Sequence, residues 1–180
     1  MSKNPPTIKT PENARHDVIP KNKEVNVRQI IQKLEKFKDN GCPFKDKRKQ
    51  IYKGMTDLEH GDKYQGCWVV DNEGKDVIHG RGVYIYANGS QYIGWFQDGE
   101  IMGMGRFVFY NGDIYQGHIE NQQFWGYGKY IFGEQHSIRG YFEGEFEDNK
   151  ITGNGTFKIQ SKRPLTKIFG KIEFETGYFD

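Results

Sequence analysis

The side chains that most often do chemistry in proteins are present in this sequence, but their spacing fits no catalytic or metal site. Cys42 and Cys67 lie far apart in the chain. None of the histidines has a partner at metal-ligand spacing. They are His16, His60, His79, His118 and His136. We therefore predict no catalytic residue, no metal and no cofactor.

Gly80-x-Gly82 and its three copies resemble phosphate-binding loops only superficially. Such a loop holds an anion where a helix N-terminus follows it, whereas here the pattern predicts strands. Glu143, Glu145 and Glu147 alternate along one predicted strand face, which indicates a solvated surface rather than an acid–base pair. A chain of 180 residues leaves no room for a catalytic domain beside the repeats described below. We predict a protein that is not an enzyme.

Charge is distributed unevenly along the chain. Residues 1–60 carry 14 Lys and Arg against 8 Asp and Glu, whereas residues 61–160 carry 8 against 13. An acidic surface is repelled by nucleic acid and by an anionic membrane. The single basic cluster, residues 45–49, is expected to be a solvated linker with weak attraction to acidic surfaces at physiological salt. We predict no nucleic-acid partner and treat membrane lipid as a disfavoured one.

The sequence is typical of an intracellular protein. No apolar run approaches the roughly 18 residues of a membrane span, and no signal-peptide pattern opens the chain. In that setting Cys42 and Cys67 are expected to be free thiols. We predict a cytoplasmic location.

A repeated pattern organises the middle of the chain. Two glycines separated by one residue recur at Gly80/Gly82, Gly103/Gly105, Gly126/Gly128 and Gly153/Gly155. An aromatic-x-Gly motif precedes each glycine pair. These motifs are Tyr64-x-Gly66, Tyr92-x-Gly94, Tyr115-x-Gly117 and Phe142-x-Gly144. The period of about 23 residues is typical of a repeat architecture. The first unit has a longer loop, around residues 71–77.

Each unit is predicted to be a β-hairpin. Side chains alternate across a strand, so a glycine between two aromatic residues leaves room for a neighbouring ring over bare backbone. Turns at Asn88-Gly89 and Asn111-Gly112 would join the hairpins into one antiparallel sheet. The residues predicted to build the repeats are Tyr64, Gly66, Trp68, Gly80, Gly82, Tyr92, Gly94, Gly103, Gly105, Tyr115, Gly117, Gly126, Gly128, Phe142, Gly144, Gly153 and Gly155.

This pattern resembles the MORN repeat (membrane occupation and recognition nexus), whose consensus is Tyr-x-Gly-x-Trp/Phe, a turn, then Gly-x-Gly and two spaced aromatics. The resemblance extends from Gly61 to Ile159. Ile168-x-Gly170-x-Ile172 resembles a fifth unit without its aromatics and glycine pair, and Tyr52-x-Gly54 resembles a half-unit before the first. The resemblance implies a mainly β fold: an elongated, single-layer antiparallel β-meander that serves as a scaffold or peptide-binding groove.

The chain is predicted to divide into four segments. Residues 1–24 are Pro-rich and predict an extended or disordered arm. Residues 25–60 predict an amphipathic helix and the basic linker. The four repeats occupy residues 61–160, and residues 161–180 predict a degenerate capping half-repeat.

The predicted helix covers residues 27–39. Apolar residues recur there at helical spacing, Asn26 is the expected N-cap and Gly41 the expected stop. Such a helix could cover the sheet, dock on a partner chain or lie on a membrane surface. The sequence favours the first.

The sheet face opposite the glycines carries a central apolar patch. Trp95, Val108, Tyr110 and Tyr127 form it, and Trp125 is expected to be exposed at a hairpin bend. An exposed patch of this kind usually marks an interaction surface, unless the helix or the N-terminal arm covers it. We predict that these five residues bind another protein, as a helix or extended peptide lying along the sheet.

These observations predict a non-enzymatic protein–protein interaction scaffold. The resemblance implies a subunit of a larger cytoskeletal assembly, with the ciliary axoneme or radial spoke as the first candidates. The alternative is a membrane-junction or phosphoinositide-binding module, which the acidic repeat region disfavours. A secreted carbohydrate- or choline-binding repeat is a third interpretation, disfavoured because no signal peptide is found.

Overall fold

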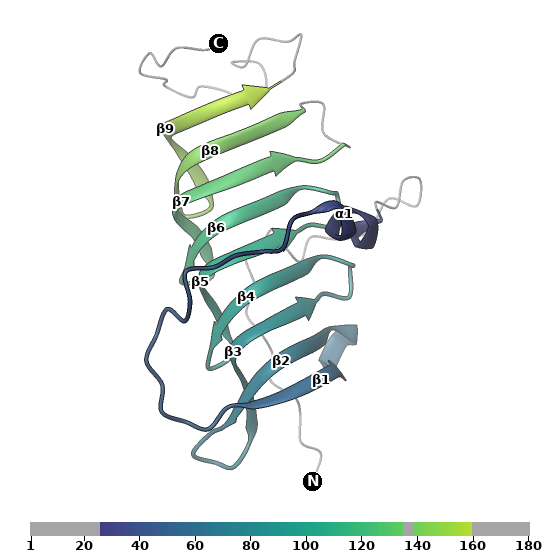
Figure 1. Ribbon diagram of the computed structural model, residues 1–180, viewed down its shortest axis with the longest axis vertical. Helices are drawn as coiled ribbons and strands as arrows, with labels where there is room; N and C mark the ends of the chain where they lie inside the picture. The colour runs from purple at the N-terminus through teal and green to yellow at the C-terminus, as the bar shows by residue number, and fades with distance from the viewer. Residues whose placement is uncertain (1–25, 135–138, 160–180) are drawn as a thin grey trace.

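Nine antiparallel strands form one open sheet in the computed structural model, which describes residues 26–134 and 139–159 (Figure 1). The strands pair in chain order, and one helix precedes them. The elements are α1 (Val27–Lys33), β1 (Ile51–Asp57), the 3-10 turn η2 (Glu59–Gly61), β2 (Lys63–Val70), β3 (Asp76–Ile85), β4 (Gln91–Gln97), β5 (Glu100–Val108), β6 (Ile114–Glu120), β7 (Gln123–Phe132), β8 (Gly140–Glu147) and β9 (Lys150–Ile159). The predicted mainly β meander is confirmed. The predicted arm of residues 1–24 and the capping half-repeat of residues 161–180 lie outside the described residues.

Each predicted unit is one hairpin, from β2–β3 to β8–β9. The two Asn-Gly turns join successive hairpins as predicted, since the Gly89 N–H donates to the Tyr86 carbonyl at 2.8 Å and the Gly112 N–H to the Phe109 carbonyl at 2.9 Å. The longer first loop is also present and closes with a hydrogen bond from Asp71 N to the Lys75 carbonyl.

The two glycines of each of the first three pairs are needed for different reasons. The first has a left-handed backbone, with φ of +89° at Gly80, +70° at Gly103 and +63° at Gly126. At each of these positions the strand register shifts, as expected for a β-bulge. The second glycine lies beneath a ring: a Cβ built on Gly128 would lie only 2.7 Å from the Tyr115 hydroxyl oxygen.

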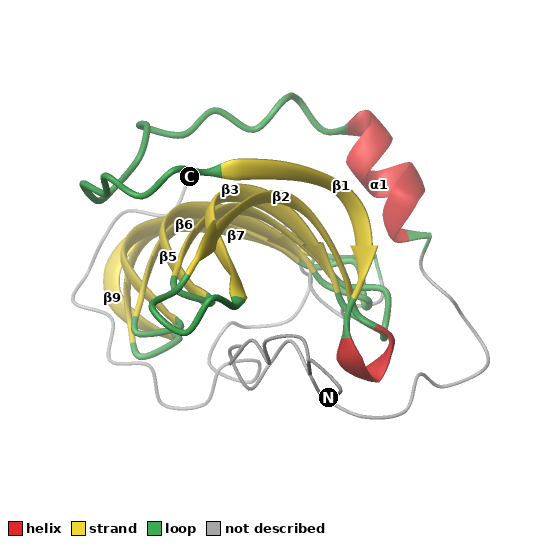
Figure 2. Cartoon of the chain, turned by 90° about the horizontal axis from the view of Figure 1, so that it is seen from below, coloured by secondary structure: helices red, strands yellow, loops and turns green. Residues whose placement is uncertain are grey.

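The aromatic core lies on the concave face of the curved sheet. α1 packs on Val108, which alternates along β5 with the buried ring of Phe107, and Figure 2 shows α1 on the convex side. The tyrosine that opens each of the first three units is buried, and its hydroxyl donates to the backbone carbonyl three residues later. The pairs are Tyr64 and Cys67 at 3.2 Å, Tyr92 and Trp95 at 3.4 Å, and Tyr115 and His118 at 2.8 Å.

The N-terminal helix is shorter than predicted. The Asn26 side chain caps it by accepting a hydrogen bond from Gln29 N at 3.1 Å, as expected, but the helix ends at Lys33 and Leu34 is extended. Gly41 is therefore not its stop. A helix of two turns has little stability of its own, and the extended chain beyond it buries Phe37 against the sheet. We call residues 34–50, which cross the convex side to β1, the strap (Figures 1 and 2).

Candidate functional site

The convex face is the candidate functional site, because the concave face is filled by the protein's own aromatic rings. The strap and α1 cover part of this face. α1 packs Val27, Ile30 and Ile31 against Val108 of β5, Ile114 of β6 and Ile131 of β7. The helix thus covers the sheet, and the remaining convex surface is what another molecule can reach.

Two arginines of the sheet hold the first half of the strap. Arg106 donates from Nη1 to the Glu35 carbonyl at 2.8 Å. Its guanidinium also lies over the Phe37 ring, 5.4 Å from the centroid. Arg81 pairs through Nε with the Asp39 carboxylate at 2.8 Å. The extended strap is therefore bound to two neighbouring hairpins as a peptide would be.

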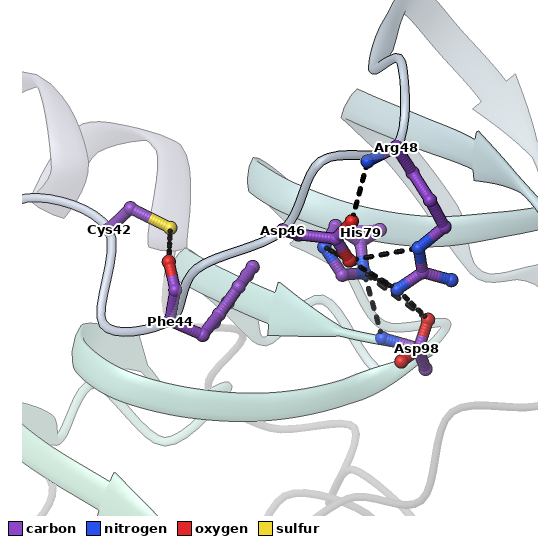
Figure 3. A network of polar contacts seen from close by, with 6 residues as sticks. All are labelled: Cys42, Phe44, Asp46, Arg48, His79 and Asp98. Carbon is purple, nitrogen blue, oxygen red and sulfur yellow. Dashed lines mark hydrogen bonds and ion pairs between the residues drawn. The ribbon is translucent and has the colours of Figure 1, made fainter.

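A polar cluster holds the second half of the strap (Figure 3). Asp46 accepts from Arg48 Nε at 2.8 Å, and the Arg48 guanidinium also pairs with Asp98 at 2.7 Å. His79 of β3 is fully buried beneath them, and its Nδ1 accepts from the Asp98 backbone N–H at 3.2 Å. A neutral ring with that acceptor carries its proton on Nε2. Nε2 lies 3.0 Å from Asp46 Oδ2 but does not form a hydrogen bond with it.

The cluster corrects the interpretation of residues 45–49 as a solvated linker. Asp46 and Arg48 form ion pairs against the sheet, and hydrogen bonds from the Arg48 side chain lower the pKa of the Asp46 carboxyl to about 2. Lys45, Lys47 and Lys49 point to solvent. The described residues contain no group of His, Cys, Asp and Glu side chains that could hold a metal ion. The cluster therefore fastens the strap to the sheet.

Three of the five predicted partner-binding residues are in contact with the protein itself. Val108 is 3% exposed and packs under α1. Trp95 meets Phe44 of the strap edge-on at 6.3 Å between ring centroids. Tyr110 lies in the turn after β5 rather than in the strand, and its backbone N–H donates to Ser90 Oγ at 3.0 Å. The sequence favours a partner chain as the molecule that covers this patch. The structure shows that α1 covers Val108 and that the strap contacts Trp95.

The side chains of Trp125 and Tyr127 are exposed to solvent. Both lie on β7, and their exposed fractions are 39% and 64%. Trp125 is inside the strand rather than at its bend, three residues after the turn at Asn121 and Gln122. The strap crosses the face away from this part of the sheet (Figure 1). The structure therefore leaves two adjacent aromatic side chains free on one strand.

A second exposed apolar group, on β1, was missed by the sequence analysis. Ile51, Tyr52 and Met55 are 43%, 64% and 51% exposed. The predicted half-unit at Tyr52-x-Gly54 is this strand, paired with β2. Its apolar residues do not alternate with polar ones, so periodicity gave no signal.

The fold defines a single-layer repeat protein whose open surface is one face of a β-meander. Three segments, residues 75–91, 92–114 and 142–161, match the family model of the MORN repeat. These matches support the MORN-repeat family and suggest a protein-interaction or membrane-binding module. The hairpin β6–β7 repeats the same geometry, with Gly117 opposite Gly128.

No curated protein matches the chain. Among the described residues, no helix is long and apolar enough to cross a membrane.

Proposed function

We propose that this protein is a non-enzymatic protein–protein interaction scaffold and that the open convex face of β7 is its partner-binding surface. The observation that supports this is the exposure of Trp125 and Tyr127, two positions apart on strand β7. Aromatic side chains dominate the binding energy of protein interfaces, and they bind best where their strand is already ordered. The partner would lie along the sheet as a helix or extended peptide.

The strap supports this mode of binding. It is an extended segment held on the same convex face by backbone carbonyls, by ion pairs and by two aromatic rings, Phe37 and Phe44. A partner peptide on the neighbouring strands could use the same kinds of contact. We further propose, by analogy with similar repeat proteins, that the assembly is cytoskeletal, with the ciliary axoneme or radial spoke as the first candidates.

The alternative, a phosphoinositide-binding or membrane-junction module, is also typical of the family. The repeat region, with 13 acidic against 8 basic side chains, is repelled by an anionic leaflet. We therefore place the protein partner first.

Photo-crosslinking and a matched pair of alanine variants test the proposal. A photo-reactive residue at position 127 should cross-link a discrete partner in cells that make the protein's assembly, and identification of that partner allows binding to be measured. Trp125→Ala with Tyr127→Ala should then weaken binding by about 30-fold or more for each hot-spot ring. The melting temperature should not change, because neither ring is in the core.

Tyr52→Ala is the control, because Tyr52 has the same exposed fraction as Tyr127, 64%. It should leave the affinity unchanged. If Tyr52→Ala weakened binding and the β7 variant did not, the partner surface would be at the β1 edge and our assignment would be wrong.

A further inference from the structure

A crevice separates the start of the strap from the convex face. Its volume is about 390 Å³, and it lies over β3, β4 and β5. Pockets for small ligands occupy about 300–1,000 Å³ and are mostly apolar. The apolar side chains of this crevice are Ile31, Leu34, Phe37, Ile93 and Val108.

Arg106 lies on the wall of this crevice, and no carboxylate among the described residues forms a close ion pair with it. The side chain is half-buried; burial lowers its pKa, and the negative charge of Glu35 raises it. Its donors meet neutral groups: Nε and Nη2 contact Gln116 Oε1 at 2.9 and 2.7 Å, and Nη1 contacts the Glu35 carbonyl at 2.8 Å. A partly desolvated charge without a close ion pair is costly.

The crevice carries one more positive than negative charge. Arg81 is paired with Asp39 at 2.8 Å. Lys36 and Glu35 also line the crevice, and the charge of Glu35 acts on Arg106. Three basic side chains, Lys36, Arg81 and Arg106, thus meet two carboxylates, and one positive charge is left over. A ligand with a single negative charge and an apolar body would neutralise it, whereas a polyanionic phosphate headgroup would bring more charge than the crevice can match.

We propose that this crevice binds an apolar monocarboxylate, such as a medium-chain fatty acid. The carboxylate accepts hydrogen bonds from the remaining guanidinium donors of Arg106, a geometry in which arginine favours carboxylates. The hydrocarbon chain lies between Leu34 and Phe37 of the strap on one side and Ile93 of β4 on the other. Because the strap forms one wall, the bound ligand also holds the strap to the sheet. The site is independent of the partner surface on β7.

Titration of the full-length protein with decanoate, followed by calorimetry or NMR, tests this proposal. We expect saturable binding and an increase in melting temperature. Decanol, which has the same chain without the charge, should bind at least about ten-fold more weakly, since a hydrogen bond to a charged group contributes about 1.5–3 kcal/mol. Arg106→Gln should lose a similar factor for decanoate and little for decanol. Arg28→Gln, at an exposed position of α1, is the control and should bind decanoate as the native protein does.

Ile93→Trp is a second variant, which keeps the charge and fills the crevice. It should abolish decanoate binding, and it decides the question if Arg106→Gln does not fold. The proposal is overturned if the native protein shows no saturable binding of decanoate below about 1 mM. Equal binding by the native protein and the folded Arg106→Gln or Ile93→Trp variant would also overturn it. Arg106-dependent binding of inositol trisphosphate in preference to decanoate would replace the monocarboxylate with a phosphate headgroup.

Discussion

Gly105→Ala should destabilise the protein, although alanine normally favours a folded strand over glycine. A Cβ at this position would lie 2.7 Å from Cζ of Tyr92, whereas carbon atoms pack best at about 3.5–4.0 Å. Cε2 of the same ring would lie nearer still, so the ring must move by more than about 1 Å. It cannot do so freely, because Tyr92 is fully buried and its ring centroid is 5.3 Å from that of Phe96 and 4.7 Å from that of Phe107. Overpacking of this kind costs about 1–3 kcal/mol.

Thermal unfolding measures the effect. Each kcal/mol should lower the melting temperature of a protein of this size by about 2–4 °C. Gly54→Ala is the matched control, since a Cβ there meets nothing within 4 Å and Gly54 has no left-handed φ. It should be neutral or stabilise the protein by up to about 1 kcal/mol. If Gly105→Ala melted at the same temperature as Gly54→Ala, the explanation of the glycine pairs by ring packing would be refuted.

Three further outcomes follow from the structure. Gln122→Gly should raise the free energy of unfolding in urea by roughly 0.5–1 kcal/mol, because Gln122 has φ of +64° in a two-residue turn that favours Asn-Gly; an unchanged midpoint would contradict this. The ion pairs of Asp46 should stabilise the fold above the ordinary carboxyl pKa of 3.8 and be lost as pH falls toward about 2. Asp46→Asn should therefore lower the free energy of unfolding at pH 7 and make it fall less steeply below pH 5. If the variant and the native protein had the same dependence of stability on pH, the role of the strap cluster would be contradicted. Liposomes with phosphoinositide should not retain the full-length protein at physiological salt; clear, salt-sensitive co-sedimentation would put the membrane interpretation first.

The repeats could be predicted from the sequence because their information is local. The spacing of Gly103 and Gly105 after Tyr92 gives the hairpin, its bulge and the position of the ring together. The sequence could not show that the two glycines differ, since only the backbone reveals the left-handed φ at Gly103. The same holds for the turn at Asn121 and Gln122, where neither residue is a glycine.

The strap could not be predicted, because its contacts join residues that are distant in sequence. Arg106 meets Glu35 from 71 positions away, and Arg48 meets His79 from 31 positions away. The apolar spacing that predicted a helix to residue 39 is real, but the chain is extended from Leu34 and buries Phe37 against the sheet. Tertiary packing therefore overrides helix propensity after Lys33. Phe44 of the strap contacts Trp95. Because the strap could not be predicted, this contact could not be predicted either.

Hydroxyl-radical footprinting of the assembled protein tests the central claim most directly. Oxidation of Trp125 and Tyr127 would be compared between the isolated protein and the protein in its native assembly, with Tyr52, which is as exposed as Tyr127, as the internal reference. Our account predicts that the two β7 rings are oxidised readily in the isolated protein and become protected in the assembly, while Tyr52 keeps its rate. Unchanged oxidation of Trp125 and Tyr127 in the assembly would contradict it.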